Sequence, residues 1–207
     1  DAGTGDDSAY LYDTAGDETY TADSDRVVLT GSGFSNEATN FDRTFTYAST
    51  GNDTATFNDT AGDDSYAAWS DRAVMLGTGY FNDARGFDST LAIATTGNDR
   101  ANFNDSAGDD TYRGYHDKAT MTGAGYSNEA RGFDSTYAYA TAGMDKAYFY
   151  DTAGNDVYSG YSDKAVMQGS GFYNSAYDFG YTAAYSTGGT DVAYLYDTVT
   201  DDTYSAW

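Results

Sequence analysis

Acidic side chains return at constant spacing along this 207-residue chain, and their chemistry is that of cation ligands. They lie in turn-like segments such as 51–53 and 59–64, and these segments recur every 46 residues. Carboxylate oxygens are the ligands that Ca²⁺ prefers in proteins. The candidate metal ligands are Asp7, Asp13, Asp53, Asp59, Asp64, Asp99, Asp105, Asp110, Asp145, Asp151, Asp156, Asp191, Asp197 and Asp202.

Two interpretations of these aspartates stay open. If equivalent residues of successive units stack in parallel strands, their carboxylates form ladders, and two charges about 4.8 Å apart repel by roughly 1 kcal/mol in water. Bound calcium would offset that repulsion, which makes calcium the candidate cofactor. Alternatively, each aspartate caps its own turn by accepting hydrogen bonds from backbone N–H groups two residues on. The two roles can coexist.

Catalytic residue types are scarce. The chain has one histidine, His116, which is serine at the equivalent positions of the other units, and it has no cysteine. No Ser/His/Asp combination, phosphate-binding loop or zinc-ligand spacing occurs. The acidic residues recur in every unit, whereas catalysis needs a unique site. We therefore predict that the protein is not an enzyme, and we name no catalytic residue.

The elements that position these residues belong to a tandem repeat. Copies of one motif begin at Asp13, Asp59, Asp105, Asp151 and Asp197, with a step of 46 residues and no insertion or deletion. Strict periodicity of this length is typical of solenoids and related arrays, in which each unit buries its apolar face against its neighbours. We expect one continuous array over residues 1–207, of about four and a half 46-residue units.

Within a unit the apolar residues alternate with a period of two, which predicts strands. In Thr54–Asn58, Ala55 and Phe57 should face inward, and further strands are expected at 65–69, 72–76 and 89–94. Proline is absent, which suits uninterrupted strand pairing. We predict an all-β fold, a parallel β-solenoid in which each unit makes one or two coils. A β-propeller-like array of four-stranded blades is the alternative.

Composition excludes several partners. The chain has 33 acidic and 10 basic residues and a formal net charge of −23, so it should repel nucleic acid and anionic membranes. No segment approaches the roughly 20 apolar residues of a membrane-spanning helix. Aromatic residues make up 17% of the chain, too many for a disordered acidic tail. We expect neither nucleic-acid binding nor a membrane span.

Two segments carry a resemblance to a known family. Gly51-Asn-Asp-Thr-Ala55 and Gly62-Asp-Asp-Ser-Tyr66 resemble the G-x-D-x-U half of the nonapeptide in calcium-binding RTX β-rolls. The whole chain is similar to the tandem-repeat exoproteins and adhesins of bacteria. It departs from the RTX pattern because the opening Gly-Gly pair is missing and the two motif glycines are 11 residues apart. The resemblance implies an extracellular or cell-surface protein with calcium at its turns.

Tyrosines flank the inward residues of the first strand of a unit, so they should point outward. Paired exposed aromatics indicate an interface with another chain or with carbohydrate, or stacks that stabilise neighbouring coils. The candidate interface residues are Tyr10, Tyr12, Tyr148, Tyr150, Tyr194, Tyr196 and Trp207.

The two ends of the array lack the polar caps that terminate many solenoids. Residues 1–5 are already in register with the repeat, and Trp207 is the counterpart of Trp69, halfway through a unit. Head-to-tail contact between such ends does not close and generates filaments. The expected function is that of a structural subunit or segment of a surface fibre whose partner is itself. The alternative is a calcium-stiffened adhesin module that binds glycans or surfaces.

Overall fold

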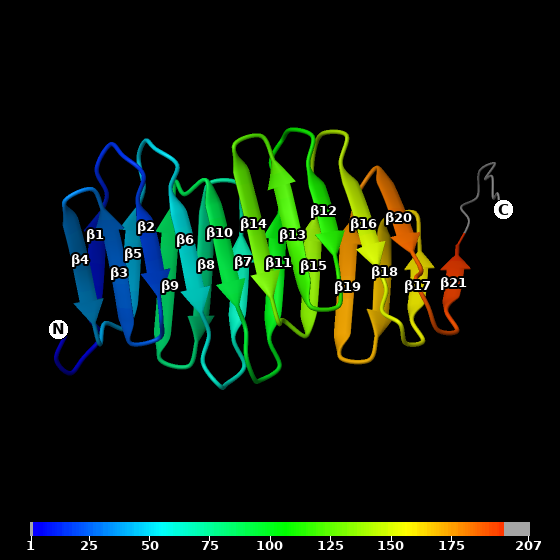
Figure 1. Cartoon of the computed structure of the whole chain (residues 1–207), viewed down its shortest axis with the longest axis horizontal. Coiled ribbons are helices and arrows are strands. Elements are labelled where there is room, and N and C mark those ends of the chain that lie inside the picture. The colour runs from blue at the N-terminus through cyan, green and yellow to red at the C-terminus, as the bar shows by residue number, and fades with distance from the viewer. Residues whose placement is uncertain (1, 197–207) are drawn as a thin grey trace.

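A computed structural model of the chain describes residues 2–196, and these form an all-β solenoid of about five turns without helices. Two sheets lie face to face, and their strands run across the long axis of the molecule, with β1 and β4 at one end and β21 at the other (Figure 1). The stack is open at both ends, unlike the closed ring of a propeller. The predicted fold class, an all-β solenoid, is confirmed.

Each sheet mixes parallel and antiparallel neighbours. In spatial order, the eleven-stranded sheet contains β1 (Ser8–Tyr12), β5 (Arg43–Tyr47), β9 (Tyr80–Arg85), β8 (Arg72–Gly77), β7 (Ser65–Ala68), β11 (Arg100–Asn104), β15 (Ser135–Tyr139), β19 (Phe172–Tyr177), β18 (Lys164–Gly169), β17 (Val157–Gly160) and β21 (Val192–Leu195). The ten-stranded sheet contains β20 (Tyr181–Tyr185), β16 (Lys146–Tyr150), β12 (Thr111–Gly114), β13 (Lys118–Gly123), β14 (Tyr126–Arg131), β10 (Ser89–Ile93), β6 (Thr54–Asn58), β2 (Thr19–Ala22), β3 (Arg26–Gly31) and β4 (Phe34–Thr39).

The 46-residue unit makes one and a half coils, so the expectation of one or two whole coils is wrong. In the first unit the chain runs from β1 to the β2–β3–β4 meander on the other sheet, returns to β5, and crosses again to β6. Because each unit crosses between the sheets three times, an odd number, equivalent residues of successive units lie on opposite sheets. Parallel neighbours are instead 35 or 38 residues apart, as in the pairs Thr54↔Ser89 and Ser89↔Ser127.

Four expected strands match β6, β7, β8 and β10, but each unit has a fifth strand that was not expected. In the second unit this strand is β9, which pairs antiparallel with β8 through a two-residue turn. The second turn residue, Gly79, has a φ of 83°, a conformation that favours glycine.

The space between the sheets is filled by the small-then-large pairs that the alternation predicted. Ala55 and Phe57 are buried, as are Ala73 and Met75. Aromatic rings form a continuous column, in which the Phe57 ring centroid lies 5.9 Å from that of Tyr66, and Tyr66 lies 6.2 Å from Phe103. Burying one such ring contributes about 1.5–3 kcal/mol. In β21 Leu195, which is equivalent to the inward-facing Phe57, is exposed.

A buried polar chain fixes the register of the coils. The Tyr66 hydroxyl lies 2.5 Å from the Thr90 hydroxyl, which donates to Asn128 Oδ1 at 2.7 Å. The Asn128 side-chain amide in turn donates to the Trp69 carbonyl at 2.9 Å. Because a one-residue slip would leave every member of this chain without a partner, these bonds specify one pairing of the strands.

Candidate metal centres

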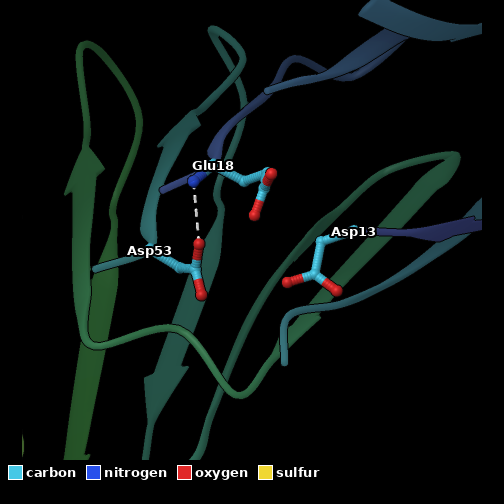
Figure 2. A group of neighbouring side chains, drawn as sticks. All are labelled: Asp13, Glu18 and Asp53. Atoms are coloured by element: carbon cyan, nitrogen blue, oxygen red, sulfur yellow. Dashed lines mark hydrogen bonds between the residues drawn. The ribbon is translucent and has the colours of Figure 1, made fainter. Parts of the chain in front are cut away.

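Four clusters of three carboxylates lie where the chain crosses between the sheets. In each cluster two residues flank a crossing loop and the third comes from the next coil, and the candidate ligand atoms lie within 4.8 Å of one another. Figure 2 shows the first cluster, in which the Glu18 side chain extends into the space between Asp13 and Asp53. The clusters are Asp13–Glu18–Asp53, Asp59–Asp64–Asp99, Asp105–Asp110–Asp145 and Asp151–Asp156–Asp191.

Backbone hydrogen bonds hold the third carboxylate in place. The Glu18 N–H donates to Asp53 Oδ1 at 2.8 Å, as Figure 2 shows, and the Asp64 N–H donates to Asp99 Oδ1 at the same distance. The donor and acceptor residues are 35 positions apart, so Asp53 and Asp99 cap the preceding coil rather than the N–H groups two residues on. The predicted ladder of equivalent carboxylates is likewise wrong, because equivalent positions alternate between the sheets.

The middle carboxylate of each cluster is tied to its own loop. Asp64 Oδ2 accepts hydrogen bonds from the Thr60 N–H at 2.9 Å and the Thr60 hydroxyl at 2.8 Å. The side chain lies directly on Gly77, where a Cβ would overlap Asp64 Oδ1 and the Tyr80 ring. Glycine at this position therefore makes room for the carboxylate.

One hydroxyl divides the clusters into two kinds. The Tyr80 hydroxyl donates to Asp64 Oδ1 at 2.9 Å, and the Tyr126 hydroxyl donates to Asp110 Oδ1 at 2.7 Å. We call these two clusters the tyrosine corners. The equivalent positions in the other two units are Phe34 and Phe172, and we call their clusters, the first and the fourth, the phenylalanine corners.

Each phenylalanine corner contains a buried carboxylate oxygen that has no hydrogen-bond partner among the described residues. These atoms are Glu18 Oε2 and Asp156 Oδ1, in side chains that are 1% and 2% exposed. Beside the fourth cluster lies a cavity of about 240 Å³, which is lined by all three of its aspartates. An unpaired buried carboxylate oxygen costs about 1–3 kcal/mol or more, so a donor or a cation there would stabilise the fold.

Burial and like charge act together in the clusters. The pKa values of Asp53, Asp99 and Asp145 are raised, first because these carboxyls are buried, and further because neighbouring carboxylates repel their charge. The Asp191 pKa is lowered because the Ser186 hydroxyl and the Asp156 N–H donate to that carboxylate. Burial and the bond to Asp64 raise the pKa of the Tyr80 phenol, so the hydroxyl stays a donor at neutral pH.

The structure brings together most of the predicted metal ligands, together with one that was not predicted. Glu18 holds the place of Asp64 in the first unit, and the 46-residue register alone could have found it. Asp7 lies outside the clusters found among the described residues, and its N–H donates to Asp42 Oδ2 at 2.8 Å. The predicted residues Asp197, Asp202 and Trp207 lie outside the described part of the chain.

The candidate interface tyrosines lie on the outer faces of the sheets, where they stack from coil to coil. Tyr10 and Tyr12 are more than half exposed and stack on Phe45 and Tyr47 with ring centroids 5.1 and 5.2 Å apart. Tyr150 stacks on Tyr115 at 4.5 Å and on Tyr185 at 5.2 Å. Tyr196 stacks on Tyr161, and Tyr148 and Tyr194 lie beside these rows.

Comparison with family models, curated proteins and solved structures found no match to the chain. Among the described residues there is no helix of the length and apolarity that crossing a membrane requires.

Proposed function

We propose that this chain is a structural subunit or segment of an extracellular or cell-surface fibre, which continues end to end by strand pairing. The observation that carries the proposal is the complementarity of the outermost strands of the ten-stranded sheet. β20 corresponds to β10, and β4 corresponds to β14. Inside the stack β10 and β14 pair with Thr90 opposite Asn128.

The side chains on these outer strands match as well. At three internal positions a threonine hydroxyl donates to an asparagine 38 residues later, always at 2.7 Å. The fourth threonine, Thr182 on β20, bonds to Tyr158 but has no asparagine beside it among the described residues. The corresponding asparagine, Asn36 on β4, is exposed and makes no side-chain hydrogen bond in residues 2–196. Placing β4 of a following copy against β20 would restore the internal pattern.

The end-to-end contact between two copies also requires one strand to be displaced. Four units, 184 residues, separate β1 from β21, and residues 9–12 and 193–196 share the sequence Ala-Tyr-Leu-Tyr. In a continuous stack β21 of one copy would stand where β1 of the next copy stands. One of the two strands must therefore leave its sheet, which makes the assembly a strand replacement.

The repeat also predicts the dimensions of the fibre. Four units add ten strands to each sheet. At about 4.8 Å per strand, joined chains should show an axial period of roughly 48 Å.

Electron microscopy and sedimentation of the purified chain test the proposal. We expect filaments with this period, and we expect the Thr182→Val/Asn36→Ala variant to shift the population strongly toward single rods. Ser35→Ala is the matched control, since Ser35 also lies on β4 but is not part of the threonine–asparagine pairs. Single rods of the wild-type chain at high concentration would contradict the proposal.

A second candidate function is favoured by the stacked tyrosines. Rows such as Tyr115–Tyr150–Tyr185 present ring edges and phenol hydroxyls along an outer face, and such hydroxyls can hydrogen-bond to sugars, as an adhesin module would require. This function predicts that single rods bind glycans on an array and that Tyr150→Ala weakens binding. Filaments without glycan binding would exclude it.

A further inference from the structure

The phenylalanine corners lack the phenol donor of the tyrosine corners, and the fourth corner is otherwise built like them, whereas the first has the longer Glu18 in place of the middle aspartate. A Cβ on Gly169 would overlap Asp156 Oδ1 and the Phe172 ring, as a Cβ on Gly77 would overlap Asp64 Oδ1 and the Tyr80 ring. The two rings therefore occupy equivalent places. The oxygen that Tyr80 satisfies in its corner corresponds in the fourth corner to Asp156 Oδ1, which has no partner among the described residues. In the first corner the longer Glu18 gives Oε1 to the Thr14 hydroxyl, and its other oxygen, Oε2, is the one without a partner in residues 2–196.

The space next to the unpaired oxygens is surrounded by negative charge. In the first corner Glu18 faces Asp13 and Asp53, and Figure 2 shows its carboxylate directed between theirs. No lysine or arginine forms an ion pair with these three residues among the described ion pairs. In the fourth corner Asp151, Asp156 and Asp191 form the same arrangement beside the cavity of about 240 Å³. A neutral donor would satisfy one oxygen, whereas a cation satisfies the oxygen and also neutralises its neighbours.

The geometry fits a calcium ion. Ca²⁺ binds oxygen ligands at about 2.3–2.6 Å, so two oxygens that share one ion lie at most roughly 5 Å apart. The ligand atoms of each cluster lie within 4.8 Å of one another. The Thr14 hydroxyl, 2.7 Å from Glu18 Oε1, lies next to the first cluster. Mg²⁺ fits less well because it requires near-ideal octahedral geometry at shorter distances.

We propose that the chain binds two calcium ions, one at each phenylalanine corner, and that Tyr80 and Tyr126 take the place of the ion in the two tyrosine corners. The first site is formed by Asp13, Glu18 and Asp53. The second is formed by Asp151, Asp156 and Asp191. The tyrosine hydroxyl and the ion are alternative partners for the middle carboxylate, so the residue at this position decides which corners bind metal. The proposal does not depend on assembly into fibres.

Calcium titration by calorimetry, with equilibrium dialysis to count bound ions, tests the proposal on the full chain. The titration is made in 150 mM salt with excess Mg²⁺, because a net charge of −23 attracts loosely held cations. For the wild-type chain we expect two ions, with Kd between about 10⁻⁵ and 10⁻³ M. Zero or four ions would overturn the proposal.

Two reciprocal double variants make the test specific. Phe34→Tyr/Phe172→Tyr should weaken both sites at least tenfold, and calcium should no longer raise the melting temperature. Tyr80→Phe/Tyr126→Phe should raise the number of ions from two to four. Each exchange inserts a residue that the same position holds in another unit, so both variants should fold. If either variant binds the wild-type number of ions with wild-type affinity, the proposal is wrong.

Discussion

The tyrosine corners and the phenylalanine corners both bury a carboxylate, but they differ in the hydrogen bonds that this carboxylate accepts. Both bury a carboxylate against a glycine, and both hold it through a threonine or serine hydroxyl four residues earlier. In a tyrosine corner the remaining oxygen accepts a phenol hydrogen bond, whereas in a phenylalanine corner one carboxylate oxygen has no partner within residues 2–196. The comparison teaches that a repeat can keep its backbone unchanged while a single hydroxyl decides whether a buried carboxylate oxygen has a protein partner.

The largest expected effect on this comparison comes from alkaline pH. Burial raises the pKa of Tyr20 to about 12, and it also raises the pKa values of Tyr66 and Tyr112. Burial, with the bond to a carboxylate, does the same for Tyr80 and Tyr126. A folded-state pKa above the unfolded value near 10 leaves stability unchanged below pH 10. Above pH 10 stability falls, by about 1.4 kcal/mol per pH unit for each such tyrosine.

Urea unfolding between pH 9 and 12 measures this slope. Tyr80→Phe/Tyr126→Phe should make it shallower, because two of the tyrosines whose pKa values are raised in the folded state are removed. Phe172→Tyr should make it steeper. If both variants keep the wild-type slope, the corner phenols ionise freely in the folded state and are not buried donors.

Removal of the middle carboxylate should destabilise a tyrosine corner more than a phenylalanine corner. Without calcium, Asp64→Ala leaves the Thr60 N–H and the Tyr80 hydroxyl without acceptors and should cost about 3 kcal/mol. Asp156→Ala also removes an acceptor of the Thr152 N–H, but it eliminates an unpaired oxygen and should cost about 1 kcal/mol. Chemical unfolding in a chelator measures both. Equal losses would mean that the tyrosine contributes nothing.

Adding or removing only the ring hydroxyl should have a smaller effect on stability. In a chelator, Tyr80→Phe should destabilise the fold by about 1.5 kcal/mol, since it deletes a hydrogen bond to a charged acceptor. Phe172→Tyr should stabilise it by about 1 kcal/mol by supplying that donor to Asp156. A destabilising Phe172→Tyr would show that the fourth corner has no room for the hydroxyl.

The smallest effect is expected from side-chain length. Glu18→Asp gives the first corner the carboxylate that the other three corners have, and it should change stability by less than about 1 kcal/mol. Calcium binding should persist, because Phe34 is unchanged. Loss of calcium binding in this variant would place the difference between the corners in the extra methylene of Glu18 rather than in Phe34.

The regular part of the fold was predictable because it follows from apolar alternation alone. In β6 and β8 the buried pairs Ala55/Phe57 and Ala73/Met75 are apolar, so the alternation identifies both strands directly. β9 was missed because Asn82 and Asp83 are buried in a strand that does not look apolar. Their partners, Thr44 for Asn82 and Arg72 and Arg85 for Asp83, come partly from other strands.

The candidate site was predictable in composition but not in geometry. The repeated aspartates identified the acidic ligands, yet the half-integral number of coils per unit decides which ones meet. Asp64 lies beside Asp99, 35 residues on, and not beside its equivalent Asp110. The role of Tyr80 could not be read from the sequence, because its hydroxyl meets Asp64 only after the β8–β9 hairpin folds back.

Anomalous diffraction from crystals grown in calcium tests the central claim most directly, because it locates each bound ion. The account predicts strong peaks among Asp13, Glu18 and Asp53 and among Asp151, Asp156 and Asp191, with no peak at the corners that contain Tyr80 and Tyr126. Peaks at all four corners, or at none, would contradict it.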